Sequence, residues 1–293
     1  MFFEGKITTN FKKQSIICQK KVFEFNEPKV MGILNITDDS FFDGGKYTDT
    51  KHAIKKAESL IEEGVDIIDI GACSTRPGAK LIEAKEEIAK ILPVLEGIRK
   101  EFPKVVISID TVWSEVSKAV ADNGADIIND ISGGTFDKAM LETIGAIKLP
   151  YVLTHCPAIP ETMQTNPSYD NLILEISKFF SKQIESLYQY GATDIILDLG
   201  FGFGKTAENN FELLARQKEF EIFGLPILTG ISRKSMIYKT LNTNAQQALN
   251  GTTFLHAFAL QNGADILRVH DVKEAKECIT LFRNYNKHIK QWN

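Results

Sequence analysis

The sequence predicts an α/β fold, a (β/α)8 barrel of the TIM type that follows a short N-terminal hairpin. Short apolar runs alternate with longer segments whose apolar residues recur every three or four positions, as in strands that alternate with amphipathic helices. A turn sequence containing Gly and Asp recurs four times, each time before an apolar run. The length of 293 residues, 43% of them hydrophobic, suits one barrel of this type.

The hairpin is predicted for residues 1–27. Apolar and polar side chains alternate there around Ile16-Ile17 and Val22-Phe23, which is typical of half-buried antiparallel strands. We expect residues 1–293 to form one domain, with this hairpin as an extension of it.

Eight apolar runs and the segments between them supply the barrel. The predicted strands are Val30–Ile36, Ile67–Ile70, Val105–Asp110, Ile127–Asn129, Tyr151–Thr154, Ile195–Leu197, Ile227–Thr229 and Ile266–Val269. The predicted helices are Ala53–Glu63, Glu83–Lys100, Glu115–Asn123, the short Lys138–Ile144, Asn171–Tyr190, Asn209–Glu219, Ala245–Gln261 and Lys273–Tyr285. Eight parallel strands alternating with helices form a closed barrel, with an open doubly wound sheet as the alternative.

The recurring turn indicates how each preceding helix ends. Its four copies are Gly64-Val65-Asp66-Ile67, Gly124-Ala125-Asp126-Ile127, Gly191-Ala192-Thr193-Asp194-Ile195 and Gly263-Ala264-Asp265-Ile266. Gly suits the left-handed conformation that follows a helix, and we expect the Asp to bond nearby backbone within the turn. Successive copies lie roughly 60–70 residues apart, about the length of two βα units.

Charge and composition argue against several kinds of partner. The net charge is −4 and no basic stripe stands out, so we expect no nucleic-acid and no membrane partner. No apolar run reaches the roughly 20 residues of a membrane span, and the first residues lack the apolar core of a signal peptide. Cys18, Cys73, Cys156 and Cys278 lack CxxC spacing, which favours reduced thiols in the cytoplasm over disulfides or a zinc site.

Polar residues stand at the end of every predicted strand. They are Asn35, Asp69, Asp110-Thr111, Asn129-Asp130, His155, Asp198, Ser232-Arg233-Lys234-Ser235 and Arg268-Val269-His270-Asp271. Each one alone could be a turn residue or a helix cap. In a TIM barrel, however, the strand ends form one mouth, where the active site lies. Asp110, Asp198 and Asn129 would offer acceptors and an amide to a flat heterocycle, and Lys234 and Arg268 would attract an anionic tail.

Two apparent nucleotide motifs fail on inspection. Gly204-Lys205-Thr206 resembles the end of a P-loop, but Leu199 stands where the first Gly is required. Gly200-Phe201-Gly202 would begin a dinucleotide fingerprint, but Lys205 stands where its third Gly is required. These glycines are better explained by close backbone approach or by a tight βα turn. No spacing of His, Cys and carboxylates indicates a permanent metal cage.

Ordered sequence matches along the chain resemble the dihydropteroate synthase family. They are Met31-Gly32-Ile33-Leu34-Asn35-Ile36-Thr37 with Asp39-Ser40-Phe41 and Asp43-Gly44-Gly45, Asp69-Ile70-Gly71 with Ser74-Thr75-Arg76-Pro77-Gly78-Ala79, Ser108-Ile109-Asp110-Thr111, Ile128-Asn129-Asp130, Gly202-Phe203-Gly204-Lys205, Ser232-Arg233-Lys234-Ser235 and Arg268-Val269-His270-Asp271-Val272. The resemblance extends from about residue 28 to the C-terminus, and its specificity lies in the order of many matches.

The resemblance implies an activity and a set of roles. The family is a transferase of folate biosynthesis and a sulfonamide target, commonly a homodimer, that joins a pterin diphosphate to p-aminobenzoate. By resemblance, the pterin is bound by Asp110, Asn129, Asp198 and Lys234, with Arg268 over the ring. Asn35, Arg268 and His270 hold the diphosphate, with Mg2+ near Asn35. Loops carrying Asp43, Thr75 and Arg76 close over p-aminobenzoate, which Ser235 and Lys234 border.

Several positions depart from the family pattern. Asp38 stands where the family usually has Pro, Phe42 where a small residue is common, and Cys73 where Glu is frequent. The segment His155-Cys156-Pro157-Ala158-Ile159-Pro160 departs from the usual His-Met-Arg-Gly-Thr-Pro, and Leu199 replaces a Pro. These departures bear on one wall of the pterin pocket, on loop closure and on sulfonamide recognition.

Two rival functions remain open at this point. A pterin-binding methyltransferase would share the pterin acids, but the Ser-Thr-Arg-Pro-Gly and Ser-Arg-Lys-Ser segments favour the synthase. A catalytically silent pterin-binding paralogue would explain the altered segment after His155 and Leu199. The presence of Asn35, Lys234, Arg268 and His270 argues against that paralogue, because diphosphate chemistry needs them.

Overall fold

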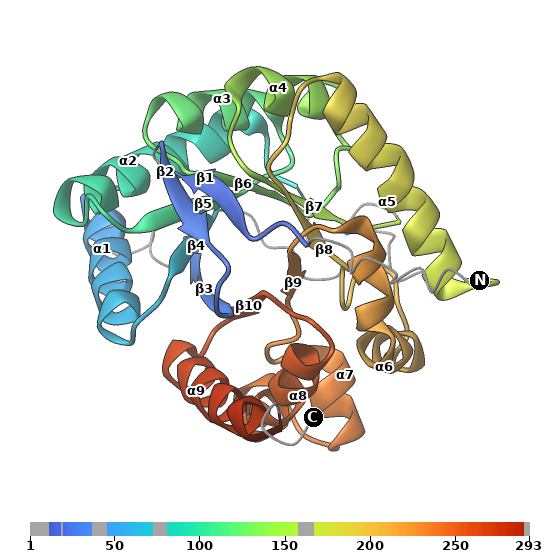
Figure 1. Ribbon diagram of the computed structural model, residues 1–293. Coiled ribbons are helices and arrows are strands. Elements are labelled where there is room, and N and C mark those ends of the chain that lie inside the picture. Colours follow the sequence, from blue (N-terminus) through green and yellow to red (C-terminus); the bar gives the residue numbers. More distant parts are fainter. Residues whose placement is uncertain (1–11, 19, 37–45, 73–80, 158–166, 290–293) are drawn as a thin grey trace, which may run out of the picture.

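Eight parallel strands form a closed barrel in the computed structural model, which describes residues 12–18, 20–36, 46–72, 81–157 and 167–289 (Figure 1). The strands are β3 (Lys29–Asn35), β4 (Ile67–Gly71), β5 (Val106–Asp110), β6 (Ile127–Asp130), β7 (Tyr151–Thr154), β8 (Ile195–Asp198), β9 (Ile227–Thr229) and β10 (Ile266–Val269). The strand β10 pairs with both β9 and β3 and so closes the barrel. This closure confirms the predicted barrel and rules out the open sheet.

Helices surround the barrel. They are α1 (Lys46–Glu62), α2 (Ala84–Glu101), α3 (Ser114–Asp122), α4 (Met140–Ile147), α5 (Leu172–Gln189), α6 (Ala207–Ala215), α7 (Ser235–Thr240), α8 (Leu249–Gln261) and α9 (Val272–Ile289), with 3-10 helices at Gln217–Phe223 and Ala245–Gln247. Their apolar faces pack with the outward side chains of the strands into one large core. No helix in the described ranges is long and apolar enough to cross a membrane.

The strands match the predictions to within one residue at either end, whereas some helices do not. The single helix predicted at Asn209–Glu219 is wrong, because α6 ends at Ala215 and a 3-10 helix follows. At that break the amide of the fully buried Gln217 bonds the Ala259 carbonyl and the Thr229 hydroxyl. The helix predicted from Ala245 begins at Leu249, and α7 was not predicted.

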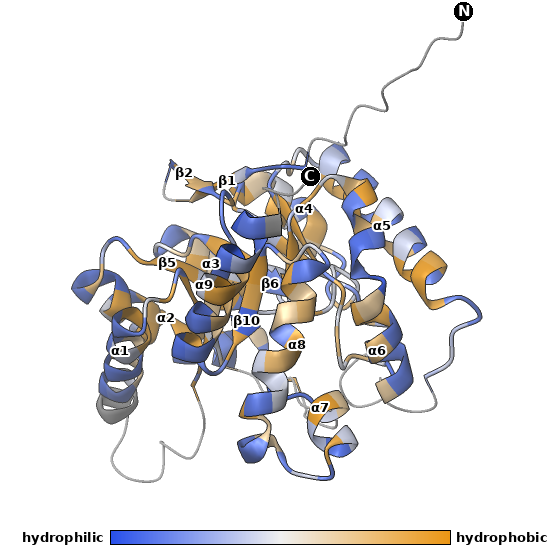
Figure 2. Cartoon of the chain, turned by 60° about the horizontal axis from the view of Figure 1, so that its bottom comes forward, coloured by the Kyte–Doolittle hydropathy of each residue, from blue (hydrophilic) through white to orange (hydrophobic). Residues whose placement is uncertain are grey.

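The hairpin closes the amino-terminal end of the barrel. Its strands β1 (Ser15–Cys18) and β2 (Lys21–Glu24) are antiparallel, as predicted. Its buried Ile16 and Cys18, with Phe25 just after it, pack on a layer of side chains near the strand starts: Met31, Ile67, Ile127, Val152, Ile196, Leu228 and Ile266. Figure 2 places β1 and β2 at one end of the molecule and α7 at the other. The carboxyl ends of the strands are therefore the open end.

The recurring Gly-Asp turn has a structural role at this closed end. The four glycines, Gly64, Gly124, Gly191 and Gly263, all have positive φ, as predicted for a residue that ends a helix. The Asp residues, however, do not bond their own turns in the way expected. Their carboxylates instead accept a backbone N–H from another segment: Val30 for Asp66, Ile107 for Asp126, Ile17 for Asp194 and Ile227 for Asp265.

Each of these carboxylates also pairs with a cation. The pairs are Asp66 with Lys276, Asp126 with Arg99, Asp194 with Lys13 and Asp265 with Lys12. Two of the cations, Lys12 and Lys13, come from the chain just before the hairpin, which therefore binds the barrel through charge as well as through apolar packing. The bond from Ile107 N–H to Asp126 is buried, so this Asp satisfies both a buried backbone donor and a cation and is hard to replace.

We predict that Asp126→Ala destabilises the protein by about 3 kcal/mol, because it leaves the buried Ile107 N–H without its acceptor and Arg99 without its anion. Urea unfolding followed by circular dichroism measures the change. The matched control is Asp122→Ala, at an exposed position in α3, which should change stability by no more than about 0.5 kcal/mol. Equal effects at both positions would contradict the structural role.

Candidate active site

Four residues on neighbouring strands at the open end are paired in register, each with the next. Asn35 of β3 pairs with Gly71, Gly71 with Asp110, and Asp110 with Asn129. A Cβ placed on Gly71 would lie 3.6 Å from the Asn35 amide oxygen and 3.5 Å from the Asp110 Cβ. A larger side chain there would fill the space between these two residues. The glycine therefore keeps the polar groups of β3 and β5 within reach of one ligand.

Arg268 of β10 bonds to two buried acids, Asp69 of β4 and Asp110 of β5. Its Nε and Nη2 each lie 2.7 Å from Asp69 Oδ2, and its Nη2 also lies 2.7 Å from Asp110 Oδ2. Asp69 Oδ2 accepts a third bond, from the Asn129 amide at 3.0 Å. One fully buried carboxylate thus orients both the arginine and the asparagine expected to contact substrate. Such charge-assisted bonds are short and directional.

Asp198 and Lys234 are two further charged residues of the mouth, and both bond to the loop after β8. The backbone N–H of Gly200 donates to Asp198 Oδ1 at 2.8 Å. Lys234 donates to the Phe201 carbonyl, and its ammonium lies 4.6 Å from the centre of the Phe203 ring. The charge of Lys234 is also close enough to Asp198 to lower the pKa of that acid. The loop after β8 therefore holds both residues.

Burial perturbs the protonation of these groups. Burial raises the pKa of Asp110 to about 7, with Arg268 opposing the rise and Asp69 adding to it. Burial also raises the pKa of Asp198, against the effect of Lys234. It lowers the pKa of Lys234 to about 8, against the effect of Asp198. Burial therefore disfavours the ionised form of these acids, so a proton, or a ligand that donates hydrogen bonds, is favoured.

His270 and Ser235 lie at the same end as these groups. His270 is the first residue after β10 and is exposed, as is Asn35 at the end of β3. Ser235 begins α7, directly after Lys234. The predicted residues Asn35, Asp110, Asn129, Asp198, Lys234, Ser235, Arg268 and His270 therefore all follow or end barrel strands at one mouth. Asp43, Thr75 and Arg76 lie outside the described residues.

Three buried charged residues near the mouth had been given no role. Asp69 is the partner of Arg268 and Asn129, and its signal was an acid inside the apolar run Ile67–Ile70. Lys205 donates to His155 Nδ1 at 3.0 Å and to the Gly200 and Phe203 carbonyls, so it ties the loop after β7 to the loop after β8. Burial lowers the pKa of Lys205 to about 7.

The third residue is Glu87, in the first turn of α2. It is buried in line with the apolar positions Ile91 and Leu95, a spacing that could have signalled it. Burial raises the pKa of Glu87 to about 8, and the neighbouring Thr111 opposes that rise. Glu87 therefore brings the start of α2 close to the end of β5, next to Asp110.

The departures from the family pattern leave the charged centre intact where the structure describes them. Leu199 is fully buried in the apolar core, and Asp198 still receives the Gly200 N–H. Cys156 is buried with Val112, Ile131 and Phe203, the ring that Lys234 faces. The thiol therefore forms part of an apolar wall beside the lysine. Asp38, Phe42, Cys73 and residues 158–160 lie outside the described residues.

Known proteins share both this sequence and this fold. Residues 31–270 match the family described as pterin binding enzyme. The chain is 42% identical over 268 residues to dihydropteroate synthase of Escherichia coli K12, covering 91% of this chain and 94% of that protein. It is similar to a Yersinia pestis dihydropteroate synthase crystallised with a sulfonamide drug, with a TM-score of 0.87, 38% identity, and coverage of 93% and 99% of the two chains. It is also similar to a Xanthomonas albilineans dihydropteroate synthase with 4-aminobenzoic acid, with a TM-score of 0.86, 33% identity, and coverage of 93% and 98%.

We predict that the stability advantage of Asp110→Asn over the unmodified protein grows as pH rises from 5 to 8. The folded-state pKa of Asp110 is raised to about 7, so the folded chain holds a proton that the unfolded chain has already lost. That contribution is present below the unfolded pKa of about 3.9 and is lost as pH rises through about 7. The amide of the variant cannot titrate, so the difference between the two proteins reports the titration of Asp110 together with the charged groups that interact with it.

Urea unfolding of both proteins at pH 5 and pH 8 measures this difference. The two free energies of unfolding should diverge with pH, with Asp110→Asn gaining relative to the unmodified protein. A constant difference across this range would mean that Asp110 stays ionised next to Arg268, and the predicted protonation would be wrong.

Proposed function

The chain belongs to the dihydropteroate synthase family of pterin-binding enzymes, and from that premise we propose how its residues carry out the reaction. The protein is a transferase that condenses hydroxymethyl-dihydropterin diphosphate with p-aminobenzoate, giving dihydropteroate and diphosphate. The observation that supports the assignment of roles is the buried cluster in which Arg268 joins Asp69 and Asp110, with Asn129 bonded to the same Asp69 oxygen.

The pterin ring is assigned to the acids of the barrel mouth. A dihydropterin carries ring N–H and amino donors as well as acceptors, so it suits Asp110, Asp198 and the Asn129 amide. Lys234 supplies a donor on the same side, held by Phe201 and Phe203. Arg268 is positioned by Asp69 to lie against the ring. These contacts would satisfy the buried acceptors described above.

The diphosphate is assigned to the exposed rim of the same mouth. Arg268 lies in β10, His270 follows that strand directly, and Asn35 ends the neighbouring strand β3. Departure of the diphosphate breaks a carbon–oxygen bond and leaves positive charge on the pterin methylene. Cations that hold the leaving oxygens stabilise the charge that develops on them. The aniline nitrogen then forms the new carbon–nitrogen bond and loses a proton.

Magnesium fits this arrangement as a companion of the diphosphate. Mg2+ prefers oxygen ligands and commonly binds through one or two protein groups plus substrate phosphates and water. The exposed amide oxygen of Asn35 is such a ligand. Among the described residues no group of three or more His, Cys, Asp or Glu could hold a metal by itself. Bound with the diphosphate, Mg2+ would neutralise its charge, while Arg268 and His270 contact it directly.

The second substrate is assigned to the loops that complete the mouth. Ser235 and Lys234 border p-aminobenzoate, and the segments with Asp43, Thr75 and Arg76 would close over it and exclude water from the cation. We expect sulfonamides to compete with p-aminobenzoate there.

The cysteines have no role in this mechanism, because it needs no covalent nucleophile. Burial raises the pKa of the Cys18 and Cys278 thiols, which disfavours the reactive thiolate. Cys18, Cys156 and Cys278 are free and buried. A cytoplasmic location remains part of the proposal.

We predict that the purified protein forms dihydropteroate and diphosphate from the pterin diphosphate, p-aminobenzoate and Mg2+, and that Lys234→Ala lowers kcat/KM by about 100-fold or more, because it removes a charged hydrogen-bond donor. Chromatography of dihydropteroate and a coupled diphosphate assay measure turnover. Lys239→Ala, at an exposed residue one turn along α7, is the matched control and should keep full activity. Tight pterin binding without turnover would instead support the silent paralogue.

We propose that two copies of the chain dimerise through α8 and α9, which lie side by side (Figure 2). Phe254 and Phe258 are exposed by 62% and 48%, and their rings contact each other edge to face with centroids 5.1 Å apart. Leu281 and Tyr285 add exposed apolar surface on α9, at 71% and 63%. A cluster of large exposed apolar side chains favours an interface between copies.

We predict that Phe258→Lys converts the dimer to a monomer, because a charge would be buried at the contact. Light scattering during size-exclusion chromatography measures the mass. Tyr188→Lys removes an equally exposed aromatic residue from α5 and should leave the dimer intact. A monomeric unmodified protein, or a dimer that survives Phe258→Lys, would refute this interface.

A further inference from the structure

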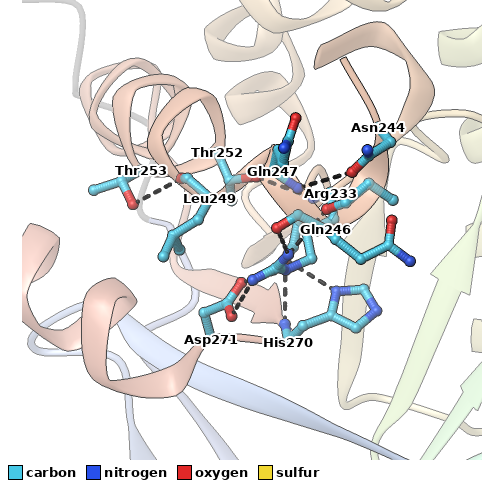
Figure 3. A network of polar contacts seen from close by, with 11 residues as sticks. Arg233, Asn244, Gln246, Gln247, Leu249, Thr252, Thr253, His270 and Asp271 are labelled. Atoms are coloured by element: carbon cyan, nitrogen blue, oxygen red, sulfur yellow. Dashed lines mark hydrogen bonds and ion pairs between the residues drawn. The ribbon is translucent and has the colours of Figure 1, made fainter. Parts of the chain in front are cut away.

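The segment between β9 and α7 contacts the segment between β10 and α9 through four side chains, of which only His270 has been given a role so far. These are Ser232 and Arg233 on the first segment, and His270 and Asp271 on the second. Figure 3 shows Asp271 directed toward the guanidinium of Arg233, with His270 next to them and Gln246 and Gln247 on the other side of Arg233. The partners are far apart in sequence and meet only because β9 and β10 are neighbours in the barrel.

Ser232 contacts His270 twice. The His270 backbone N–H donates to Ser232 Oγ at 3.2 Å, and the same oxygen lies 3.1 Å from His270 Nδ1. The hydroxyl has already accepted the backbone bond, so its own hydrogen is directed most simply to Nδ1. An Nδ1 that accepts a bond is unprotonated, and a neutral imidazole then carries its hydrogen on Nε2.

Arg233 holds Asp271, the residue that follows His270. Its Nε and Nη2 donate to the two oxygens of Asp271 at 2.8 and 2.7 Å, and its Nη1 donates to the Ala245 and Gln246 carbonyls. Its backbone N–H donates to the buried Thr252 hydroxyl. The guanidinium therefore connects three segments. It does so from a left-handed backbone, with φ of 55°, which a residue with a side chain adopts at a cost.

The surroundings of His270 favour a neutral imidazole that donates a hydrogen bond to an anionic ligand. The residue as a whole is exposed, and the contact with Ser232 occupies Nδ1 and leaves Nε2 as the other ring nitrogen. Protein crowds the ring enough that burial, reinforced by the charges of Arg268, Arg233 and Lys234, lowers the pKa of His270 to about 4. Asp271 opposes that shift but does not overcome it. Arg268 and Lys234 are the cations already assigned to substrate, so the ring lies next to the same site.

We propose that Ser232 and Arg233 are positioning residues that hold His270 as an Nε2–H hydrogen-bond donor toward the diphosphate of the substrate. The inference rests on the proposed role of His270 and adds the atom that acts and the residues that set it. Ser232 selects the tautomer, and Arg233 fixes the turn from which the ring projects. The left-handed backbone at Arg233 persists because the side chain's bonds to Asp271 and to residues 245–246 require it.

The tautomer can be observed directly. Histidine labelled with nitrogen-15 in the full-length protein, with His270→Gln to assign the signal among five histidines, should show an unprotonated Nδ1 and a protonated Nε2 at His270. Ser232→Ala should shift the signal toward the other tautomer or a mixture, and Ser232→Thr, which keeps the hydroxyl, should restore it. A protonated Nδ1 in the unmodified protein would overturn the proposal.

Kinetics separate positioning from a general structural effect. Ser232→Ala should raise KM for the pterin diphosphate, or lower kcat, by roughly tenfold, the effect of one hydrogen bond to a charged group, with little change in KM for p-aminobenzoate. His270→Gln places an amide N–H near the Nε2 position and should keep more activity than His270→Asn, which can mimic only Nδ1. If His270→Asn is as active as His270→Gln, the assignment of Nε2 as the donor atom is wrong. If both variants match the unmodified enzyme, the proposed role of His270 fails instead.

Two substitutions at Arg233 separate its side chain from its backbone. Arg233→Gly tolerates the positive φ, whereas Arg233→Ala does not, and both remove the guanidinium. If the bonds to Asp271 matter, both variants should lose about tenfold in kcat/KM for the pterin diphosphate, and His270 should lose its single tautomer in both. Full activity and an unchanged His270 signal in Arg233→Gly would show that only the backbone conformation is needed, and would overturn the role assigned to Arg233.

Discussion

The candidate site depends on one buried charge interaction, the guanidinium of Arg268 held between Asp69 and Asp110. Two acids this close repel each other and are costly to bury, so a cation between them makes the arrangement possible. Because Asp69 also binds the Asn129 amide, strands β4, β5, β6 and β10 are joined by a single set of bonds. A change at Asp69 would therefore reach residues assigned to both the pterin and the diphosphate.

Glycines around this centre leave space for the charged side chains. Gly71 separates Asn35 from Asp110, and a Cβ on Gly230 would lie 3.8 Å from the Arg268 Cβ and 3.9 Å from Asp198 Oδ2. Gly202, at positive φ, would place a Cβ 3.1 Å from Lys234 Cδ, and a Cβ on Gly200 would collide with the His155 carbonyl oxygen. The glycine-rich loop thus lets Lys234 and the segment after β7 approach. That loop is a tight turn built around protein groups, one of the two explanations the sequence had left open.

Much of the fold was predictable because the barrel repeats one pattern that is visible locally. Apolar runs that end in a polar residue marked every strand and brought Asn35, Asp110, Asn129, Asp198 and Arg268 to one mouth. The partners of these residues were not predictable, since Asp69 and Arg268 lie 199 positions apart and pairing between them follows only from closure. The break after α6 was missed for the same kind of reason, because the contacts of Gln217 with Ala259 and Thr229 override local helical periodicity.

The two ends of the barrel use acidic side chains in opposite ways. At the closed end, Asp66, Asp126, Asp194 and Asp265 each have one backbone donor and one cation of their own, and these bonds serve stability. At the open end, Asp69, Asp110 and Asp198 share Arg268 and Lys234, and Asp69 Oδ1 has no partner among the described residues. Burial raises the pKa of Asp110 and Asp198 there, and it also raises that of Asp265 at the closed end, where Lys12 opposes the rise. Buried acceptors without a donor are costly, and they become favourable contacts for a ring rich in N–H donors, which supports assigning the pterin to the open end and not to the closed one.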